Sequence, residues 1–461
     1  MEALKRLHAP LAWVDGRWQR DVLLSVDAAG HWSEVTANMP APPGAEVLAG
    51  PLIPSLVNAH SHAFQRAFVG LAERRDAGQD DFWSWRDRMY ALALRISPQQ
   101  LRAVASQLYA ELLRGGYTQV CEFHYLHHPA DLAHGGQAFD DELDMAWALT
   151  EAAQDAGIGL TLLPVVYTRS GFGATGLRPD QHRFEADADW VWRACQRIMA
   201  AGLPRVNAGV ALHSLRGASA ADMLRLHQQL GAAEVPIHIH VAEQTAEVAD
   251  CVQATGKRPI QWLAEEGYLD ARWQLVHATH AEPAEIEAVA RSGAGIVICP
   301  GTEANLGDGL TDLPRWLSHG VPLTVGSDSQ VTRGWVEELR WLEYGQRLAL
   351  RQRNVAAAPG VQPSSAARLF DAAVSGGARA AGFAAWGLTP GARADALVLN
   401  READGLRGLP DEALLDAVVF GGNGSPWQSV WVAGRARPWR APERVGDAFE
   451  AAMRELWQSG S

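Results

Sequence analysis

The chain has 461 residues, of which 48% are hydrophobic and 20% are charged, and its formal net charge is −13. This composition is typical of a globular protein with a large core and argues against intrinsic disorder. The acidic balance, without a long run of lysine or arginine, argues against nucleic acid or an anionic membrane as a partner. An anionic substrate would therefore need local arginines.

Two features of the chain bear on its location. The first eight residues contain no apolar core of a signal peptide, and no uninterrupted apolar run approaches eighteen residues. The four cysteines, Cys121, Cys195, Cys251 and Cys299, lie far apart and form no Cys-x-x-Cys pair. We therefore expect a cytoplasmic protein with reduced, buried cysteines.

Residues 11–50, at the start of the chain, alternate as short strands separated by Gly and Pro turns. Eight longer apolar segments follow, at residues 51–62, 118–125, 158–167, 205–214, 236–243, 273–280, 295–302 and 322–329. Amphipathic, helix-like stretches separate most of them, at residues 97–115, 140–156, 183–201, 220–230, 259–266 and 283–292. This alternation indicates parallel strands, and eight of them predict a closed (β/α)8 barrel.

Residues 388–437 return to short strands with Gly and Pro turns. We expect the two ends of the chain to pair into a small β-sandwich-like domain beside the barrel. The predicted division gives residues 1–50 and 385–461, with a terminal helix, to the small domain and residues 51–384 to an α/β barrel. Within the barrel, Ser97 and Gln100 flank a proline at a helix start and predict a capping box.

His60-Ser61-His62 ends the first barrel segment. In a strand, alternate residues share one face, so both imidazoles point to the same place and suit a divalent metal. The pair is a weak signal by itself, because the chain contains 16 histidines. Its weight depends on what the other strands bring to the same end of the barrel.

Four more acid or imidazole groups end later segments. His240 and Glu243 end the fifth, His277 ends the sixth and Asp328 ends the eighth. The carboxyl ends of barrel strands converge on one mouth. Singly, each histidine could be a hydrogen-bonded core residue and Asp328 could cap a helix. Together they predict one polar site, because buried ionisable groups are costly unless they are paired or ligated.

This order of residues, His-x-His, His-x-x-Glu, a sixth-strand His and an eighth-strand Asp, resembles the amidohydrolase superfamily. The resemblance covers nearly the whole chain and includes residues 305–309 and 388–395. It implies one divalent metal, with Zn²⁺ as the expected ion. The absence of a bridging fourth-strand lysine favours the mononuclear branch, whose ligands fall on His60, His62, His240 and Asp328.

The resemblance also implies a mechanism. A bound zinc ion lowers the pKa of a water ligand from about 15.7 to roughly 7. Asp328 would orient this water and take its proton, and His277 would polarise the water or the tetrahedral centre. Glu243 would carry a proton to an imine nitrogen and then to departing ammonia. The chemistry implied is hydrolytic deamination at a C=N carbon.

Residues 63–66, 82–90, 122–125 and 211–216 resemble the N-formimino-L-glutamate deiminases of histidine degradation. Their dicarboxylate substrate requires cations, and guanidinium groups bind carboxylates bidentately. The expected anchors are Arg86 and Arg216, with further contacts from Gln65, Tyr125 and His213. Arg86 could instead stack on a neighbouring tryptophan, Trp83 or Trp85.

Two other functions stay open. The first is an aminohydrolase of a heteroaromatic ring, such as guanine or an S-adenosylhomocysteine-like nucleoside, whose pocket would use aromatic stacking and amide groups in place of paired arginines. The second is a catalytically silent barrel that serves as a binding module. The combination of Glu243, His277 and Asp328 argues against a silent barrel, because a scaffold has no need of a proton shuttle. The family resemblance also suggests a homodimer.

Overall fold

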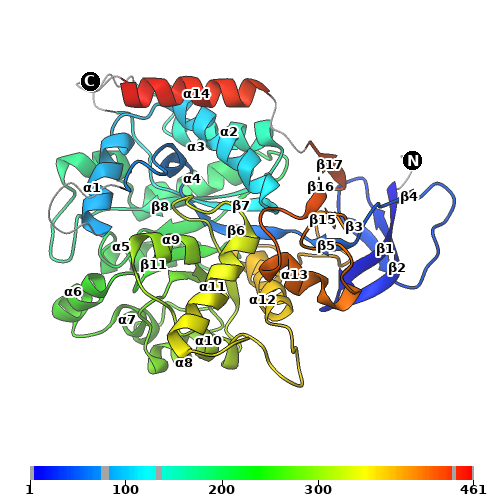
Figure 1. The fold of residues 1–461 in the computed structure, drawn as a ribbon. Coiled ribbons are helices and arrows are strands. Elements are labelled where there is room, and N and C mark those ends of the chain that lie inside the picture. The colour runs from blue at the N-terminus through cyan, green and yellow to red at the C-terminus, as the bar shows by residue number, and fades with distance from the viewer. Residues whose placement is uncertain (1–4, 74–81, 131–137, 439–442, 459–461) are drawn as a thin grey trace.

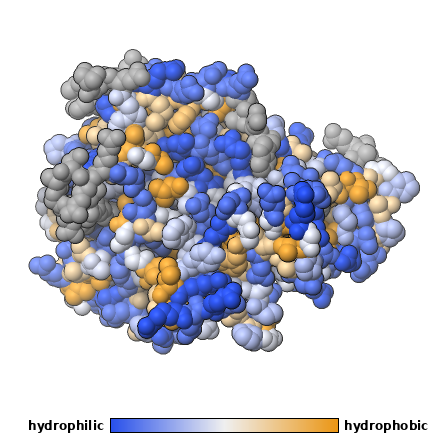
Figure 2. Space-filling model, in the orientation of Figure 1, coloured by the Kyte–Doolittle hydropathy of each residue, from blue (hydrophilic) through white to orange (hydrophobic). Residues whose placement is uncertain are grey.

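The computed structural model describes residues 5–73, 82–130, 138–438 and 443–458. The middle of the chain forms a parallel barrel, and the two ends of the chain form a separate sheet beside it (Figure 1). On the face shown in Figure 2, hydrophilic residues cover most of the surface and hydrophobic residues form small scattered patches. Among the described residues, no helix is both long and apolar enough to cross a membrane.

Eight parallel strands form the path of the barrel: β6 (Leu56–Ser61), β7 (Tyr117–His124), β8 (Gly159–Val166), β10 (Val210–Leu212), β11 (Ile237–Val241), β12 (Trp273–His277), β13 (Gly295–Ile298) and β14 (Leu323–Val325). A short strand, β9 (Val206–Ala208), also pairs with β8. The first and last strands meet where Asp328 N donates to His60 O at 3.0 Å and His62 N donates to Asp328 O at 3.2 Å. These bonds close the barrel and confirm the predicted fold.

Helices surround the barrel (Figure 1). They are α1 (Phe82–Ala93), α2 (Pro98–Arg114), α3 (Asp144–Ala156), α4 (Ala188–Ala200), α5 (Ala220–Leu230), α6 (Thr245–Thr255), α7 (Pro259–Glu265), α8 (Pro283–Ser292), α9 (Pro300–Leu306), α10 (Leu313–Ser318), α11 (Trp335–Leu350) and α12 (Ser365–Ala380), with short 3-10 helices η1 (Ala63–Ala67) and η3 (Pro179–Phe184). All six predicted helices form. The capping box is also present, because Gln100 N donates to Ser97 Oγ at 3.2 Å and Ser97 N donates to Gln100 Oε1 at 3.0 Å.

The ends of the chain form one mixed sheet. Its strands are β1 (Lys5–Val14), β2 (Arg17–Val26), β3 (Trp32–Thr36), β4 (Glu46–Val47), β5 (Leu52–Pro54), β15 (Ala396–Leu399), β16 (Trp427–Val432) and β17 (Arg435–Arg437). The antiparallel pair β5 and β15 joins the amino-terminal strands to the carboxy-terminal strands. Three helices complete this part of the chain: η4 (Asp411–Ala413), α13 (Leu414–Phe420) and the terminal α14 (Glu443–Gln458), which packs on α2.

Several predicted strands differ from the structure, and residues 205–214 form two short strands, β9 and β10. The segment at residues 51–62 is two strands, with β5 in the sheet of the chain ends and β6 in the barrel. The segment at residues 295–302 ends as a strand at Ile298, and α9 then begins at Pro300. Proline suits the first position of a helix, but the apolar run before it has no helical periodicity, so the sequence does not indicate where the strand ends and the helix begins. The domain boundaries at residues 50 and 385 stay a prediction.

Every residue of β11 and β12 is buried. Helices cover the outer face of such strands, and side chains fill the inside of the barrel. A polar side chain near the end of one of these strands therefore lies in a protected environment and needs a partner.

Candidate active site

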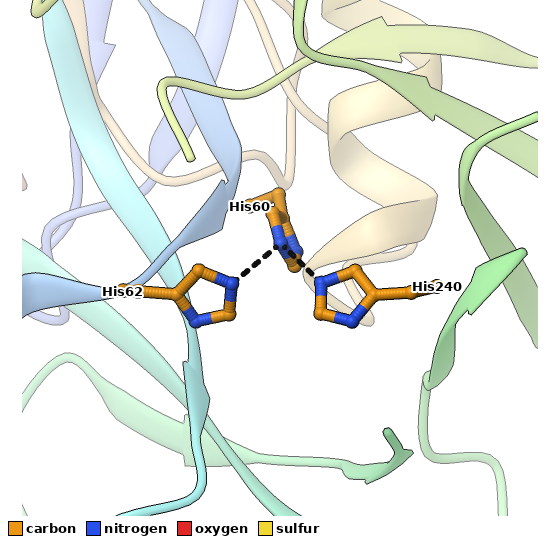
Figure 3. Close-up of side chains that lie close together, drawn as sticks. All are labelled: His60, His62 and His240. Carbon is orange, nitrogen blue, oxygen red and sulfur yellow. Dashed lines mark hydrogen bonds between the residues drawn. The ribbon is translucent and has the colours of Figure 1, made fainter. Parts of the chain in front are cut away.

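Three histidines meet at the carboxyl ends of the strands. His60 lies on β6, His62 directly follows it, and His240 lies on β11. The Nε2 atom of His60 is 3.2 Å from Nε2 of His62 and 3.0 Å from Nε2 of His240 (Figure 3). All three side chains are buried. The structure therefore brings together imidazoles that are separated by up to 180 positions in the sequence.

The backbone determines which nitrogen of two of these rings carries a proton. His62 Nδ1 is 3.0 Å from Phe123 O, and His240 Nδ1 is 3.0 Å from His213 O. A carbonyl oxygen only accepts hydrogen bonds, so each Nδ1 is the donor and each Nε2 presents a lone pair to the centre. His60 Nε2 could donate to only one of them. A cation at the centre would satisfy all three nitrogens, so this donor set fits a divalent metal ion.

The electrostatics of the cluster agree with this fit. Burial lowers the pKa of His60 to about 3 and also lowers the pKa of His62 and His240, which keeps the rings in the neutral form that binds metals. Asp328 Oδ1 lies 3.5 Å from His60 Nε2 and 3.3 Å from His62 Nε2. Burial opposes the charge of Asp328, but the neighbouring imidazoles hold its pKa below the usual range. A charged carboxylate thus completes the cluster.

Glu243 and His277 lie beside Asp328. His277 Nε2 is 3.8 Å from Glu243 Oε1 and 3.8 Å from Asp328 Oδ2, while His277 Nδ1 donates to Glu303 Oε1 at 3.3 Å. Burial raises the pKa of Glu243 to about 7, and the charges of Asp328 and Glu247 add to this rise. Burial alone would lower the pKa of His277, but the surrounding carboxylates outweigh it and raise that pKa to about 10. Near neutral pH, Glu243 can therefore gain or release a proton readily.

The backbone at these strand ends is unusual. Ala242, His277 and Asp328 have φ angles of 52°, 69° and 47°, in the left-handed region that favours glycine. Such conformations cost about 1–3 kcal/mol each and persist only where the surroundings enforce them. They turn the chain sharply at the barrel mouth, at the predicted site residues His277 and Asp328 and directly before a third, Glu243.

Sequence reasoning missed two buried glutamates that support this region. Glu303, on α9, accepts from His277 Nδ1 and also from Cys299 N at 2.9 Å. Glu247, on α6, accepts from the backbone N–H groups of Ala242 and Glu243. In the sequence, each resembles an ordinary acid in the first turn of a helix. Their position in the sequence could have indicated a role at the site, because both glutamates follow closely after the end of a barrel strand.

One pocket joins the cluster to the predicted substrate residues. Its lining includes His62, His240, Glu243, His277 and Asp328 from the strand ends, together with Gln65, Arg86, Tyr125, His213 and Arg216. His60 lies fully buried behind them. The other lining residues are Trp85, Met89, Tyr90, Tyr167, Phe184, Ser214, Glu247, Thr302 and Leu306. The pocket is partly open to solvent, and its lining combines the polar cluster with aromatic rings and two guanidinium groups, which is typical of a small-molecule site.

The predicted substrate residues come from several elements. Gln65 lies on η1 and donates from Nε2 to Tyr125 OH at 3.2 Å. Arg86 lies on α1, with its guanidinium 5.6 Å from the centre of the Tyr90 ring. His213 and Arg216 follow β10. The structure thus places all five predicted residues around one space, with two guanidinium groups among them.

Comparison with known proteins gives the family. Residues 52–437 match the model of the amidohydrolase family. The chain is 43% identical to the formimidoylglutamate deiminase of Pseudomonas aeruginosa, in an alignment that covers 98% of this chain and 100% of that protein. It is 26% identical to the 5-methylthioadenosine/S-adenosylhomocysteine deaminase of Natronomonas pharaonis, over 83% of this chain and 80% of that protein.

Solved structures agree with this result. An amidohydrolase from Brucella melitensis superposes with a TM-score of 0.91 at 39% identity, covering 98% of this chain and 99% of that one. An adenosine deaminase from Xanthomonas campestris with bound zinc superposes with a TM-score of 0.79 at 22% identity, covering 98% of each chain. This second likeness supports the fold alone. The family model, the sequence relatives and the shared architecture establish that the chain belongs to the amidohydrolase family.

Proposed function

We propose that this protein hydrolyses N-formimino-L-glutamate to N-formyl-L-glutamate and ammonia, the deimination step of histidine degradation. The observation that carries the proposal is a single pocket that holds both the imidazole and carboxylate cluster and the two guanidinium groups of Arg86 and Arg216. The 43% identity to a formimidoylglutamate deiminase over almost the whole chain supports the same substrate.

The residues that would hold the metal are His60, His62, His240 and Asp328, and zinc is the ion we propose. When bound there, zinc would supply a Lewis acid that lowers the pKa of water to about 7 and so provides a nucleophile at neutral pH. Nitrogen and carboxylate ligands of this kind also accept iron, manganese or cobalt, so the metal content of the purified protein is the direct test of this choice.

The remaining groups of the chain move protons. Water adds to the formimino carbon, and a carboxylate oxygen of Asp328 takes one proton from it. Glu243 delivers a proton to the imine nitrogen, which becomes an amino group. The proton taken up by Asp328 then passes to this amino nitrogen while the hydroxyl of the adduct returns its proton to Glu243. The C–N bond breaks, the nitrogen leaves as ammonia, and the carbon keeps the oxygen as a formyl group. His277, held by Glu303 through Nδ1, directs Nε2 toward this centre and stabilises the charge that develops on oxygen.

The guanidinium groups would bind the two carboxylates of the substrate. Arg86 and Arg216 are half-buried at the pocket wall, where a charge-assisted hydrogen bond is stronger than in water. Gln65 and Tyr125 would add hydrogen bonds, and His213 would contact the substrate near the reacting carbon. Binding at both ends would hold the formimino group still at the imidazole cluster, which favours reaction through proximity.

One observation favours a second substrate class, heteroaromatic rings such as purines. Tyr90, Tyr125, Tyr167, Phe184 and Trp85 line the same pocket, and aromatic rings of this kind could stack on a purine. An aminohydrolase of guanine or of an S-adenosylhomocysteine-like nucleoside would use the same metal ligands. Such a reaction would not need the paired arginines.

The test is ammonia release by the zinc-loaded protein with N-formimino-L-glutamate, N-formimino-L-aspartate, guanine, adenosine and S-adenosylhomocysteine. We expect fast turnover of formiminoglutamate and slow turnover of the shorter formimino acid. Turnover of a ring substrate alone would reject the proposed substrate and keep the metal site. Loss of ammonia release from every substrate would favour the binding-module alternative. The homodimer and the cytoplasmic location stay predictions.

A further inference from the structure

Glu247 is a buried carboxylate to which the reaction described above assigns no part. It lies in the first turn of α6, four residues after Glu243, and lines the substrate pocket. Its side chain is only 5% exposed. A buried carboxylate at a pocket wall is costly unless hydrogen bonds satisfy it, so its partners indicate why it is there.

The hydrogen-bond partners of Glu247 include two consecutive backbone N–H groups, and the charge of Arg216 also acts on this carboxylate. Ala242 N donates to Oε1 at 3.1 Å, and Glu243 N donates to Oε2 at 3.0 Å. The two carboxylate oxygens thus hold the N–H groups of two consecutive peptide units, one on each side of the Ala242 Cα atom. Both bonds involve a charged acceptor, which makes them stronger than ordinary backbone bonds.

The segment held in this way has a demanding geometry. His240 faces the imidazole cluster and Glu243 faces His277, so the chain must turn within three residues. It does so at Ala242, whose φ of 52° is strained for any residue other than glycine. The bonds from Glu247 hold the N–H groups on both sides of Ala242, while Ala242 O accepts from His280 N at 3.0 Å, so loss of the Glu247 bonds would loosen the amide side of the turn that carries the Glu243 carboxylate.

We propose that Glu247 is a positioning residue for the proton shuttle: its carboxylate clamps the left-handed turn at Ala242 and thereby aims Glu243 at the reacting centre. The inference rests on the proposed role of Glu243 and holds for any substrate that the pocket turns over. In this proposal Glu247 holds the backbone and Glu243 carries the proton.

The first measurement is the kinetics of Glu247→Gln in the metal-loaded protein. The amide keeps one acceptor but turns an NH2 group toward a backbone N–H, so one of the two bonds is lost. We expect kcat to fall about 10–100-fold, the range seen when a supporting hydrogen bond to a reacting group is removed. We expect KM to change less than kcat, although the charge of Glu247 also acts on Arg216, and the metal content to stay the same, because the imidazoles do not depend on this clamp.

The second measurement separates positioning from general stability. Glycine adopts a positive φ without strain, so Ala242→Gly removes the reason for the clamp. In the Ala242→Gly background, Glu247→Gln should lower kcat at least about fivefold less than it does in the wild-type background, as a double-mutant cycle would show. If the two substitutions act independently, the proposal is wrong. Should Glu247→Gln fail to fold, Glu247→Asp, whose shorter side chain cannot reach both N–H groups, enters the same cycle.

Glu285 supplies a matched control. It is also a buried glutamate that accepts from two backbone N–H groups, those of Glu282 and Gln261, but it lies on α8 and does not line the pocket. Glu285→Gln should lower thermal stability while leaving kcat unchanged. An equal loss of kcat in both variants would overturn the proposal. The variants are compared on whichever substrate the wild type turns over, so a wrong substrate leaves this test intact.

Discussion

Two parts of the same pocket are built in different ways: the imidazole cluster, and the substrate wall formed by Gln65, Arg86, Tyr125, His213 and Arg216. The cluster rests on strand ends: His60 and His240 lie within strands, and hydrogen bonds to neighbouring strands fix their backbone. The wall rests on other elements, with Arg86 on the helix α1 and Arg216 after the end of β10. Cluster residues are buried, whereas the two arginines are half-buried.

This difference separates chemistry from recognition. A closed ladder of strands leaves little freedom in the position of its ends, so the metal and proton groups can be held within the tolerance that catalysis needs. Loops and a peripheral helix tolerate change more readily and can be altered without moving the cluster. Substitutions in the cluster should therefore affect the reaction itself, and substitutions in the wall should affect the choice of substrate.

The largest effect should come from removal of a metal ligand. A Lewis acid contributes several kcal/mol to such reactions, so His240→Ala should lower turnover by at least about a thousandfold and reduce bound metal, which elemental analysis would measure. His238→Ala is the control, because His238 lies on the same strand but binds Ala380 O at 2.8 Å, away from the cluster. Full metal content with His240→Ala would show that the ligand set is wrong.

Within the cluster, Glu243→Gln should separate proton transfer from metal binding. The amide cannot carry the proton, so kcat should fall by at least about a hundredfold, within the usual range for a general acid and base. Bound metal and the melting temperature should stay at the wild-type values. A variant that keeps turnover within tenfold of the wild type would remove Glu243 from the mechanism.

In the wall, Arg86→Gln and Arg216→Gln should act mainly through binding. Loss of a charge-assisted hydrogen bond costs about 1.5–3 kcal/mol, which corresponds to roughly a 10–100-fold higher KM for formiminoglutamate. Bound metal should stay at the wild-type level in both variants, whereas we expect it to fall in His240→Ala. If both variants keep wild-type kinetics, the arginines do not bind the substrate and the ring aminohydrolase becomes the better function.

The same contrast explains how much could be predicted. The eight strands and the residues at their ends were readable, because apolar runs separated by helical patterns fix a barrel and the barrel fixes where its strands end. The five predicted wall residues came from the family resemblance, since nothing in the local pattern around Arg86 distinguishes a substrate anchor from a surface charge. The structure places them at the pocket, and their roles stay predictions.

What was missed has a common physical cause. Glu247 and Glu303 act through backbone N–H groups and a ring nitrogen, and these partners exist only after the chain has turned at Ala242 and His277. Left-handed backbone at a non-glycine residue has no signature in the sequence. The split of residues 51–62 between β5 and β6 was hidden in the same way, because an unbroken apolar run does not show that its two halves join different sheets.

The smallest effect tests whether the outer shell of the barrel is independent of both regions. Ser97 caps α2 by accepting from Gln100 N, and loss of such a cap costs about 1 kcal/mol. Ser97→Ala should therefore lower the urea midpoint of unfolding slightly and leave kcat and KM unchanged. Gln99→Ala, at an exposed neighbouring position, should leave all three quantities unchanged. A change of KM in Ser97→Ala would mean that α2 influences the pocket. The helices around the barrel would then affect substrate binding, and the contrast between a fixed cluster and an adjustable wall would no longer describe the pocket by itself.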